Sequence, residues 1–226
     1  LYHPQNHDDS VFHYGNDYKT GILDFLSQAL FALGYPDRAQ VIADEALAHA
    51  EQLNHAYTLG YALHWCNLIA IHRREPEIVH EQAQRLLRLS SDQGFSYWLG
   101  MAHFQMGSAL VEQGEADNAI DLIEQGIADH RNAGSAIVLP MMFYFLAKAY
   151  IQADRLSEAE EPLREAIEQS EKTGERWFLA ELYRLQGEWL LHKPSAEQQA
   201  EALFQQALTL ARQQHARAWE LRAAIS

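Results

Sequence analysis

The residues best suited to chemistry in this chain are a single cysteine and a few histidines and carboxylates. Cys66 follows Trp65 in a helical pattern and could act as a nucleophile. A free cysteine is commonly a small core residue, and that is the interpretation we favour. Glu77 and His80 form a Glu-x-x-His pair, whereas helical iron sites need two such pairs and further glutamates. No second pair fits that pattern, so we interpret this one as part of a solvated helix face.

Histidines also gather near the start of the chain. His3, His7, Asp8 and His13 could bind a metal ion adventitiously, although we favour a tethering segment for residues 1–16. The sequence has no cysteine pair for zinc, no Walker-type phosphate loop and no dinucleotide-binding glycine motif. We therefore expect no catalytic residue, no metal and no cofactor, and we expect that this chain is not an enzyme.

The strongest pattern is an internal repeat of about 40 residues. Small apolar residues recur at steps of 40, 40, 40 and 41, at Ala39, Val79, Ala119, Ala159 and Ala200. A period in this range is typical of solenoids, in which each copy buries its apolar faces against its neighbours. After the tether, we place one domain over 17–226, with repeats at 17–54, 55–94, 95–134, 135–174 and 175–215, and a truncated helix at 216–226. The pattern stops inside a sixth copy, so we expect the chain to be a fragment of a longer protein.

Each copy carries two helical patterns joined by a turn. In the first copy, apolar residues from Ile22 to Leu33 recur at helical spacing. Gly34-Tyr35-Pro36 then interrupts the helix, and Asp37 can cap the next one. Similar breaks follow at Arg74-Glu75-Pro76, Gly114-Glu115, Asp154-Arg155 and Lys193-Pro194-Ser195. Alternating strand patterns are almost absent, so the sequence predicts an all-α chain of about five antiparallel helix pairs.

The small and large positions within each copy match the tetratricopeptide pattern. In the third copy they hold Met106, Gly107, Leu110, Ala119, Ile123 and Gly126. Residues 180–191 (AELYRLQGEWLL), 200–208 (AEALFQQAL) and 211–224 (ARQQHARAWELRAA) further resemble the C-terminal tetratricopeptide region of large bacterial signalling ATPases. Those proteins often carry a class III adenylate or guanylate cyclase domain, or a DNA-binding domain, ahead of the ATPase module. The resemblance implies an α-α superhelix whose nucleotide chemistry would lie upstream of this chain.

Composition narrows the partners and the compartment. The net charge of −14 argues against contacts with nucleic acid, because those need clustered Lys and Arg. An acidic solenoid could attract a basic partner, but we favour solvated outer faces as the explanation of the charge. No apolar run reaches the ~18–20 residues of a membrane span, and no secretory signal opens the sequence. With one cysteine, we expect no internal disulfide and a cytoplasmic location.

In tetratricopeptide folds, four positions of each first helix line the concave face. Carried over copy by copy, these positions predict a groove that includes Tyr61, His64, Met101, Phe104, Ser108, Met141, Tyr144, Lys148, Arg184 and Glu188. Aromatic and methionine side chains on a concave face suit binding of a peptide or an apolar ligand. The alternative is a tightly curled superhelix in which these residues pack against one another.

From these patterns we expect a non-catalytic regulatory module of a larger signalling ATPase. Its groove would bind a partner protein, a peptide or an upstream segment of the same chain. A domain that senses a small-molecule effector is the alternative, and it would require a closed pocket rather than an open groove.

Overall fold

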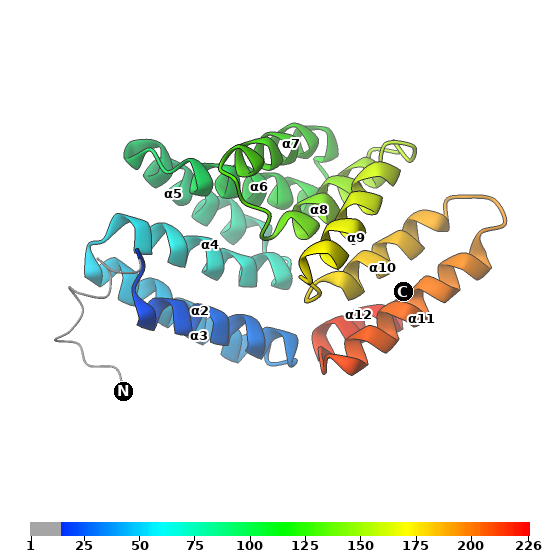
Figure 1. Cartoon of the computed structure of the whole chain (residues 1–226), viewed down its shortest axis with the longest axis horizontal. Helices are drawn as coiled ribbons and strands as arrows, with labels where there is room; N and C mark the ends of the chain where they lie inside the picture. The colour runs from blue at the N-terminus through cyan, green and yellow to red at the C-terminus, as the bar shows by residue number, and fades with distance from the viewer. Residues whose placement is uncertain (1–14) are drawn as a thin grey trace.

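The computed structural model describes residues 15–226 of the chain. The histidine cluster at His3, His7, Asp8 and His13 lies outside these residues, as does nearly all of the tether predicted at 1–16. Residues 15–226 form eleven helices and no strand (Figure 1). The helices are α2 (Tyr18–Ala32), α3 (Pro36–Leu53), α4 (Ala56–Arg73), α5 (Pro76–Gln93), α6 (Ser96–Gln113), α7 (Ala116–Asn132), α8 (Leu139–Gln152), α9 (Glu160–Thr173), α10 (Leu179–Leu190), α11 (Glu197–Gln213) and α12 (Arg217–Ile225). The predicted all-α fold of five helix pairs is therefore confirmed.

Most of the turns contain one residue in the left-handed backbone region. Within the pairs these residues are Gly34, Arg74, Gly114, Asp154 and Ser195, and between the pairs they are Asn54, Gly94, Gly134, Gly174 and His215. This conformation ends a helix and lets the next one run back alongside it. The sequence breaks near positions 34, 74, 114 and 154 thus coincide with the points where the chain reverses.

Small residues bring the two helices of a pair into close contact. A Cβ atom added at Gly126 of α7 would lie 2.8 Å from both Gly100 O and Phe104 N of α6. One added at Gly107 would lie 2.5 Å from the Cγ1 atom of Ile123. Distances this short exclude any larger side chain unless the neighbouring atoms move. The third pair is therefore packed through its glycines.

The superhelix curls until α12 contacts α2, the first helix of the described residues (Figure 1). The Trp219 ring of α12 lies 5.7 Å from the Phe31 ring and 5.2 Å from the His72 ring, measured between centroids. Arg222 Nη2 donates a 2.5 Å hydrogen bond to the backbone oxygen of His72, which lies 150 positions earlier in the chain. Phe178 completes this cluster at 5.6 Å from Trp219. We call these five residues the closing seam.

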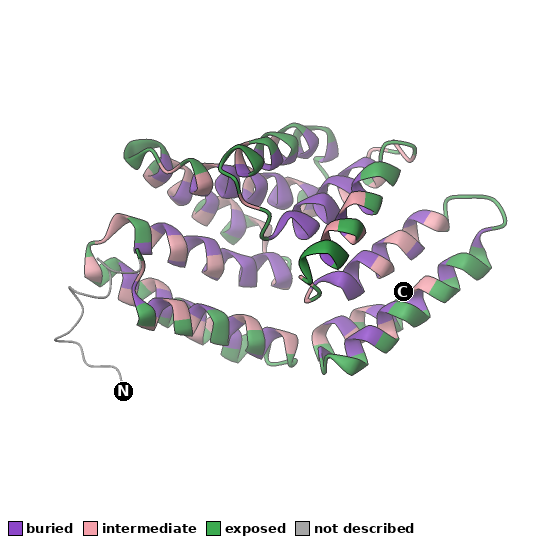
Figure 2. Cartoon of the chain, viewed as in Figure 1, coloured by how far each residue is buried: buried purple, intermediate pink, exposed green. Residues whose placement is uncertain are grey.

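Burial follows the curl of the chain. The helices α4, α6 and α8 are buried around much of their circumference, whereas α5, α7 and α9 alternate buried and exposed faces (Figure 2). Inner helices contact neighbours on several sides, so few of their positions reach solvent. None of the helices in residues 15–226 has the length and apolar composition needed to cross a membrane.

Candidate functional site

A cavity of about 1170 Å³ lies inside the curl of the superhelix. Its walls come from α2, α4 and α6, and from the turns that precede α8, α10 and α12. Trp219 of α12 also lines the cavity, together with Phe31 and His72, so the cavity depends on the closing seam for one of its walls. The lining side chains are mainly apolar and aromatic.

One side of the cavity is a continuous layer of aromatic rings. It consists of Phe25, Tyr57, Tyr61, Trp65, Tyr97 and Trp98. Neighbouring ring centroids lie 5.2 Å apart for Phe25 and Trp65, 6.0 Å for Tyr61 and Trp65, and 5.5 Å for Tyr57 and Trp98. Gln28 Nε2 donates a 3.0 Å hydrogen bond to the backbone oxygen of Trp65. Phe25 and Tyr57 are 59% and 38% exposed, so apolar ring surface remains open to a ligand.

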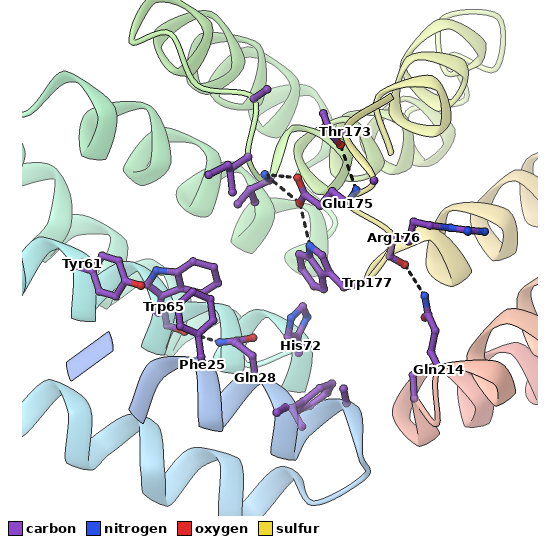
Figure 3. A pocket seen from close by; sticks show the side chains of 18 of the residues that line it. Phe25, Gln28, Tyr61, Trp65, His72, Thr173, Glu175, Arg176, Trp177 and Gln214 are labelled. Atoms are coloured by element: carbon purple, nitrogen blue, oxygen red, sulfur yellow. Dashed lines mark hydrogen bonds between the residues drawn. The ribbon is translucent and has the colours of Figure 1, made fainter. Parts of the chain in front are cut away.

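The opposite side is built from the turns before α8 and α10. Figure 3 shows Glu175 and Trp177 on this side, across from Tyr61 and Trp65. Glu175 Oε1 accepts hydrogen bonds from Trp177 Nε1 at 2.9 Å and from Val138 N at 3.1 Å. Val138 has φ 71°, which is a strained conformation for a β-branched residue. The Glu175 carboxylate therefore holds two neighbouring turns together at the cavity wall.

The cavity contains little positive charge. Burial lowers the pKa of His72 to about 3, with a smaller contribution from Arg222, so its ring is neutral at physiological pH. Arg176 lines the cavity, but its side chain extends away from Glu175 and Trp177 (Figure 3). Its backbone oxygen accepts a hydrogen bond from Gln214 Nε2 at 2.9 Å. Burial also raises the pKa of Glu175, while the bonds from Trp177 and Val138 oppose that rise.

Seven of the ten predicted groove residues fall into two groups. Tyr61 lines the cavity, whereas six others are buried in the packed interior beside it, namely His64, Met101, Phe104, Ser108, Met141 and Tyr144. Met101, Phe104 and Met141 have no exposed surface, because the inner helices contact one another around the tight curl. Their assignment to a binding surface stays a prediction. The sequence also allowed a tightly curled superhelix in which the inner residues pack against one another. That alternative describes the surroundings of these six side chains.

The three charged groove residues form ion pairs. Lys148 Nζ contacts a carboxylate oxygen of Glu112. Arg184 pairs with Glu181 and Glu188, and its Nη2 donates a 3.0 Å hydrogen bond to the Tyr144 hydroxyl. These contacts are made within the chain, so a ligand that bound these groups would have to compete with existing partners.

The cysteine and the Glu-x-x-His pair that could do chemistry lie outside the cavity lining. Cys66 is 7% exposed, its Sγ donates a 2.7 Å hydrogen bond to Ala43 O, and burial raises the pKa of its thiol well above the usual value. This environment supports the interpretation of Cys66 as a core residue. His80 contacts Gln84 at 2.8 Å, and Glu77 is exposed. Over residues 15–226 the structure brings together no group of three side chains suited to a metal ion.

Most of the cavity residues were not among those predicted from the groove positions. Four of them nevertheless occupy one repeat position, with a step of 40 residues, at Tyr57, Tyr97, Ile137 and Trp177. They precede or begin the first helix of their copies, ahead of the four positions from which the groove was predicted. The recurrence of large apolar residues there was a signal that could have identified this wall.

Comparison with known proteins places the fold among helical repeats. No protein-family model and no curated protein matches the sequence. Among solved structures, the apo form of RapI superposes with a TM-score of 0.64 at 16% identity, over 96% of this chain and 87% of RapI. PlcR from Bacillus thuringiensis, in complex with the peptide PapR7 and DNA, gives 0.74 at 17% identity, over 90% of this chain and 73% of PlcR.

A putative kinesin light chain from Podosopora anserina with nearly identical tetratricopeptide-like repeats gives a TM-score of 0.54 at 15% identity, over 88% of this chain and 98% of its own. These identities relate the structures by fold alone. The presence of DNA in the PlcR structure means that the comparison lends no support to the expected absence of nucleic acid, which rests on charge only. The architecture of residues 15–226 is that of a tetratricopeptide-like α-α superhelix.

Proposed function

We propose that this chain is a non-catalytic binding and regulatory module that takes its ligand into the aromatic cavity. The observation that carries this proposal is an apolar cavity of about 1170 Å³ with open ring surface, on the inner side of a superhelix whose last helix contacts α2. Sites of this kind bind ligands through apolar contact, and a few polar groups set the orientation. The similarity of fold to RapI and PlcR, the latter solved with a bound peptide, is consistent with this role.

The first candidate ligand is a short segment of a partner protein or of the same chain. The cavity is somewhat larger than the ~300–1000 Å³ typical of small-molecule sites, so a short peptide would have room. A small-molecule effector is the second candidate, and the apolar, aromatic lining of the cavity would suit it as well. Both would exploit the same ring surface of Phe25, Tyr57 and Trp65.

The closing seam offers a route from binding to regulation. Phe31, His72 and Trp219 belong both to the seam and to the cavity wall. A ligand that contacts these rings would change the relative stability of the closed and opened superhelix, because it binds the two arrangements with different affinity. In a larger signalling ATPase, that shift would bias the upstream ATPase or output domain. The chain by itself should neither hydrolyse ATP nor form a cyclic nucleotide.

The test uses the tryptophans as reporters, because four of the five line the cavity. The chain is titrated with N-phenyl-1-naphthylamine, a neutral apolar fluorophore, and energy transfer from tryptophan is followed. Phe25→Ala should weaken binding by about fivefold, since an aromatic contact contributes ~1 kcal/mol. Tyr35→Ala is the matched control, as Tyr35 is 51% exposed and lies outside the cavity. Equal binding by the wild type and both variants would refute the cavity as the site.

A further inference from the structure

The wall of the cavity carries one carboxylate that has no ion-pair partner among the described residues and that lies among aromatic rings. The ionisable side chains that line it are the phenols of Tyr57, Tyr61 and Tyr97, the neutral ring of His72, and the charged groups of Glu175 and Arg176. Of the two charged groups, Arg176 extends outward (Figure 3). Glu175 is thus the one carboxylate among the described lining residues, and no described cation forms an ion pair with it.

The hydrogen bonds of Glu175 leave room for a cationic partner. Its Oε1 atom accepts from Trp177 Nε1 and from Val138 N, whereas Oε2 shares only the Val138 donor, at 3.2 Å. Both donors are neutral backbone or indole N–H groups. A half-buried carboxylate without a counter-charge gains more from a cation than an exposed one, because the surrounding protein screens the attraction less than water does.

The rings near this carboxylate suit the same ligand. Trp177 lies 5.9 Å from the His72 ring, with part of its own surface exposed to the cavity, and Tyr61 and Trp65 face it from the other side (Figure 3). The faces of indole and phenol rings attract cations, and Trp is the strongest of the aromatic residues in this respect. Carboxylate and rings together favour a positive group over a neutral or a negative one.

We propose that the cavity binds an apolar ligand that carries an ammonium group, with the ammonium against the Oε2 atom of Glu175 and over the face of the Trp177 ring. The apolar body lies against Tyr61, Trp65 and Phe25. This inference rests on the proposed function, since it assigns the chemistry of the ligand that the cavity takes. Two sources supply such chemistry, a small amine and the amino group of a peptide.

The experiment compares matched charged and neutral probes at pH 7 by tryptophan fluorescence. For the small-molecule source the probes are 4-phenylbutylamine and 4-phenylbutanol. For the peptide source they are the tetrapeptide Leu-Phe-Val-Leu amide with a free and with an acetylated amino end. We expect the amine to bind about tenfold more tightly than its neutral counterpart in at least one pair, as for a charge-assisted contact worth ~1.4 kcal/mol. The pair that shows the preference identifies the source.

The variants separate the charge from the cavity itself. Glu175→Gln keeps an acceptor for Trp177 and Val138 but removes the charge, so it should abolish the preference for the amine while affinity for the neutral probe changes less than about twofold. Glu171→Gln, at an exposed position on α9, is the control and should leave the preference intact. If Glu175→Gln fails to fold, Trp177→Phe provides the second variant and should reduce the preference about threefold, because phenyl rings attract cations less strongly.

The outcomes distinguish this inference from the proposed function. Neutral and charged probes that bind equally, or a preference that survives in Glu175→Gln, would refute the ammonium site while the cavity stands. If the neutral probes and N-phenyl-1-naphthylamine all fail to bind, the cavity as a binding site and the ammonium site fall together.

Discussion

Replacing Asp24 by Asn should stabilise the protein at neutral pH. Asp24 lies on α2 with no exposed surface. Its Oδ2 atom has no hydrogen-bond partner among the described residues, and its Oδ1 atom has a contact only at 4.0 Å, with Cys66 Sγ. Burial raises the pKa of this carboxyl to about 9, so the folded protein keeps a proton that the unfolded chain releases.

The sign and the size of the stability change follow from the difference between the folded and the unfolded pKa of Asp24. The folded-state pKa lies above the unfolded value of 3.8, so the stability linked to Asp24 is fully present below pH 3.8 and is lost as the pH rises toward about 9. The slope is ~1.4 kcal/mol per pH unit, which amounts to roughly 4 kcal/mol at pH 7. Asparagine avoids this loss but places an amide N–H₂ group in the same site, at a cost of ~1–3 kcal/mol. The net gain at pH 7 should be about 1–3 kcal/mol.

The assay is urea unfolding, followed by tryptophan fluorescence, at pH 5, 6, 7 and 8. The difference in free energy of unfolding between Asp24→Asn and the wild type should grow with pH and favour the variant at pH 7 and 8, and the melting temperature at pH 7 should rise by roughly 2–12 °C. Asp44→Asn, at an exposed position on α3, controls for loss of one negative charge. If Asp24→Asn and the wild type show parallel pH dependences, Asp24 is ionised in the folded protein and the reasoning fails.

Four further substitutions test the packing and the closing seam. Ala119→Leu and Ala159→Leu should each destabilise the protein by ~1–3 kcal/mol in urea unfolding, because both alanines have no exposed surface; neutral results at both would mean that the repeat register is wrong. Phe104→Ala should cost ~3–5 kcal/mol, since it empties a fully buried site, and a loss below 1 kcal/mol would contradict that placement. Arg222→Met removes the hydrogen bond to the His72 backbone and should cost about 1.5–3 kcal/mol while shifting Trp219 emission to the red, whereas unchanged emission would argue against the seam.

The repeat and its helix pairs were predictable from the sequence because they depend on local chemistry. Gly34 and Gly114 favour the left-handed backbone that ends a helix, and the breaks recur with the repeat. Ala119 and Gly126 leave space for a facing helix, and that requirement acts between neighbours in the same pair. Such signals lie within about 40 residues of one another, so a single copy contains most of them.

The sequence also predicted which side chains lie on the inner helices. It did not predict that these side chains are buried. Phe104 and Tyr144 lie on inner helices as the repeat register predicts, yet one is fully buried and the other 3% exposed. Whether an inner position lines an open groove depends on the curvature of the superhelix. Curvature accumulates from small rotations at every helix contact, and no single motif encodes it.

The closing of the chain on itself was decided by tertiary structure alone. Trp219 meets Phe31, and Arg222 reaches the backbone of His72, across separations of 150 residues or more that no local pattern reports. The cavity exists because this contact supplies one of its walls, and Glu175 acquires its role because the turns before α8 and α10 meet beside it. The local sequence thus determined the repeating unit and its helices, whereas the sum of many small packing angles decided where distant copies meet and what they enclose.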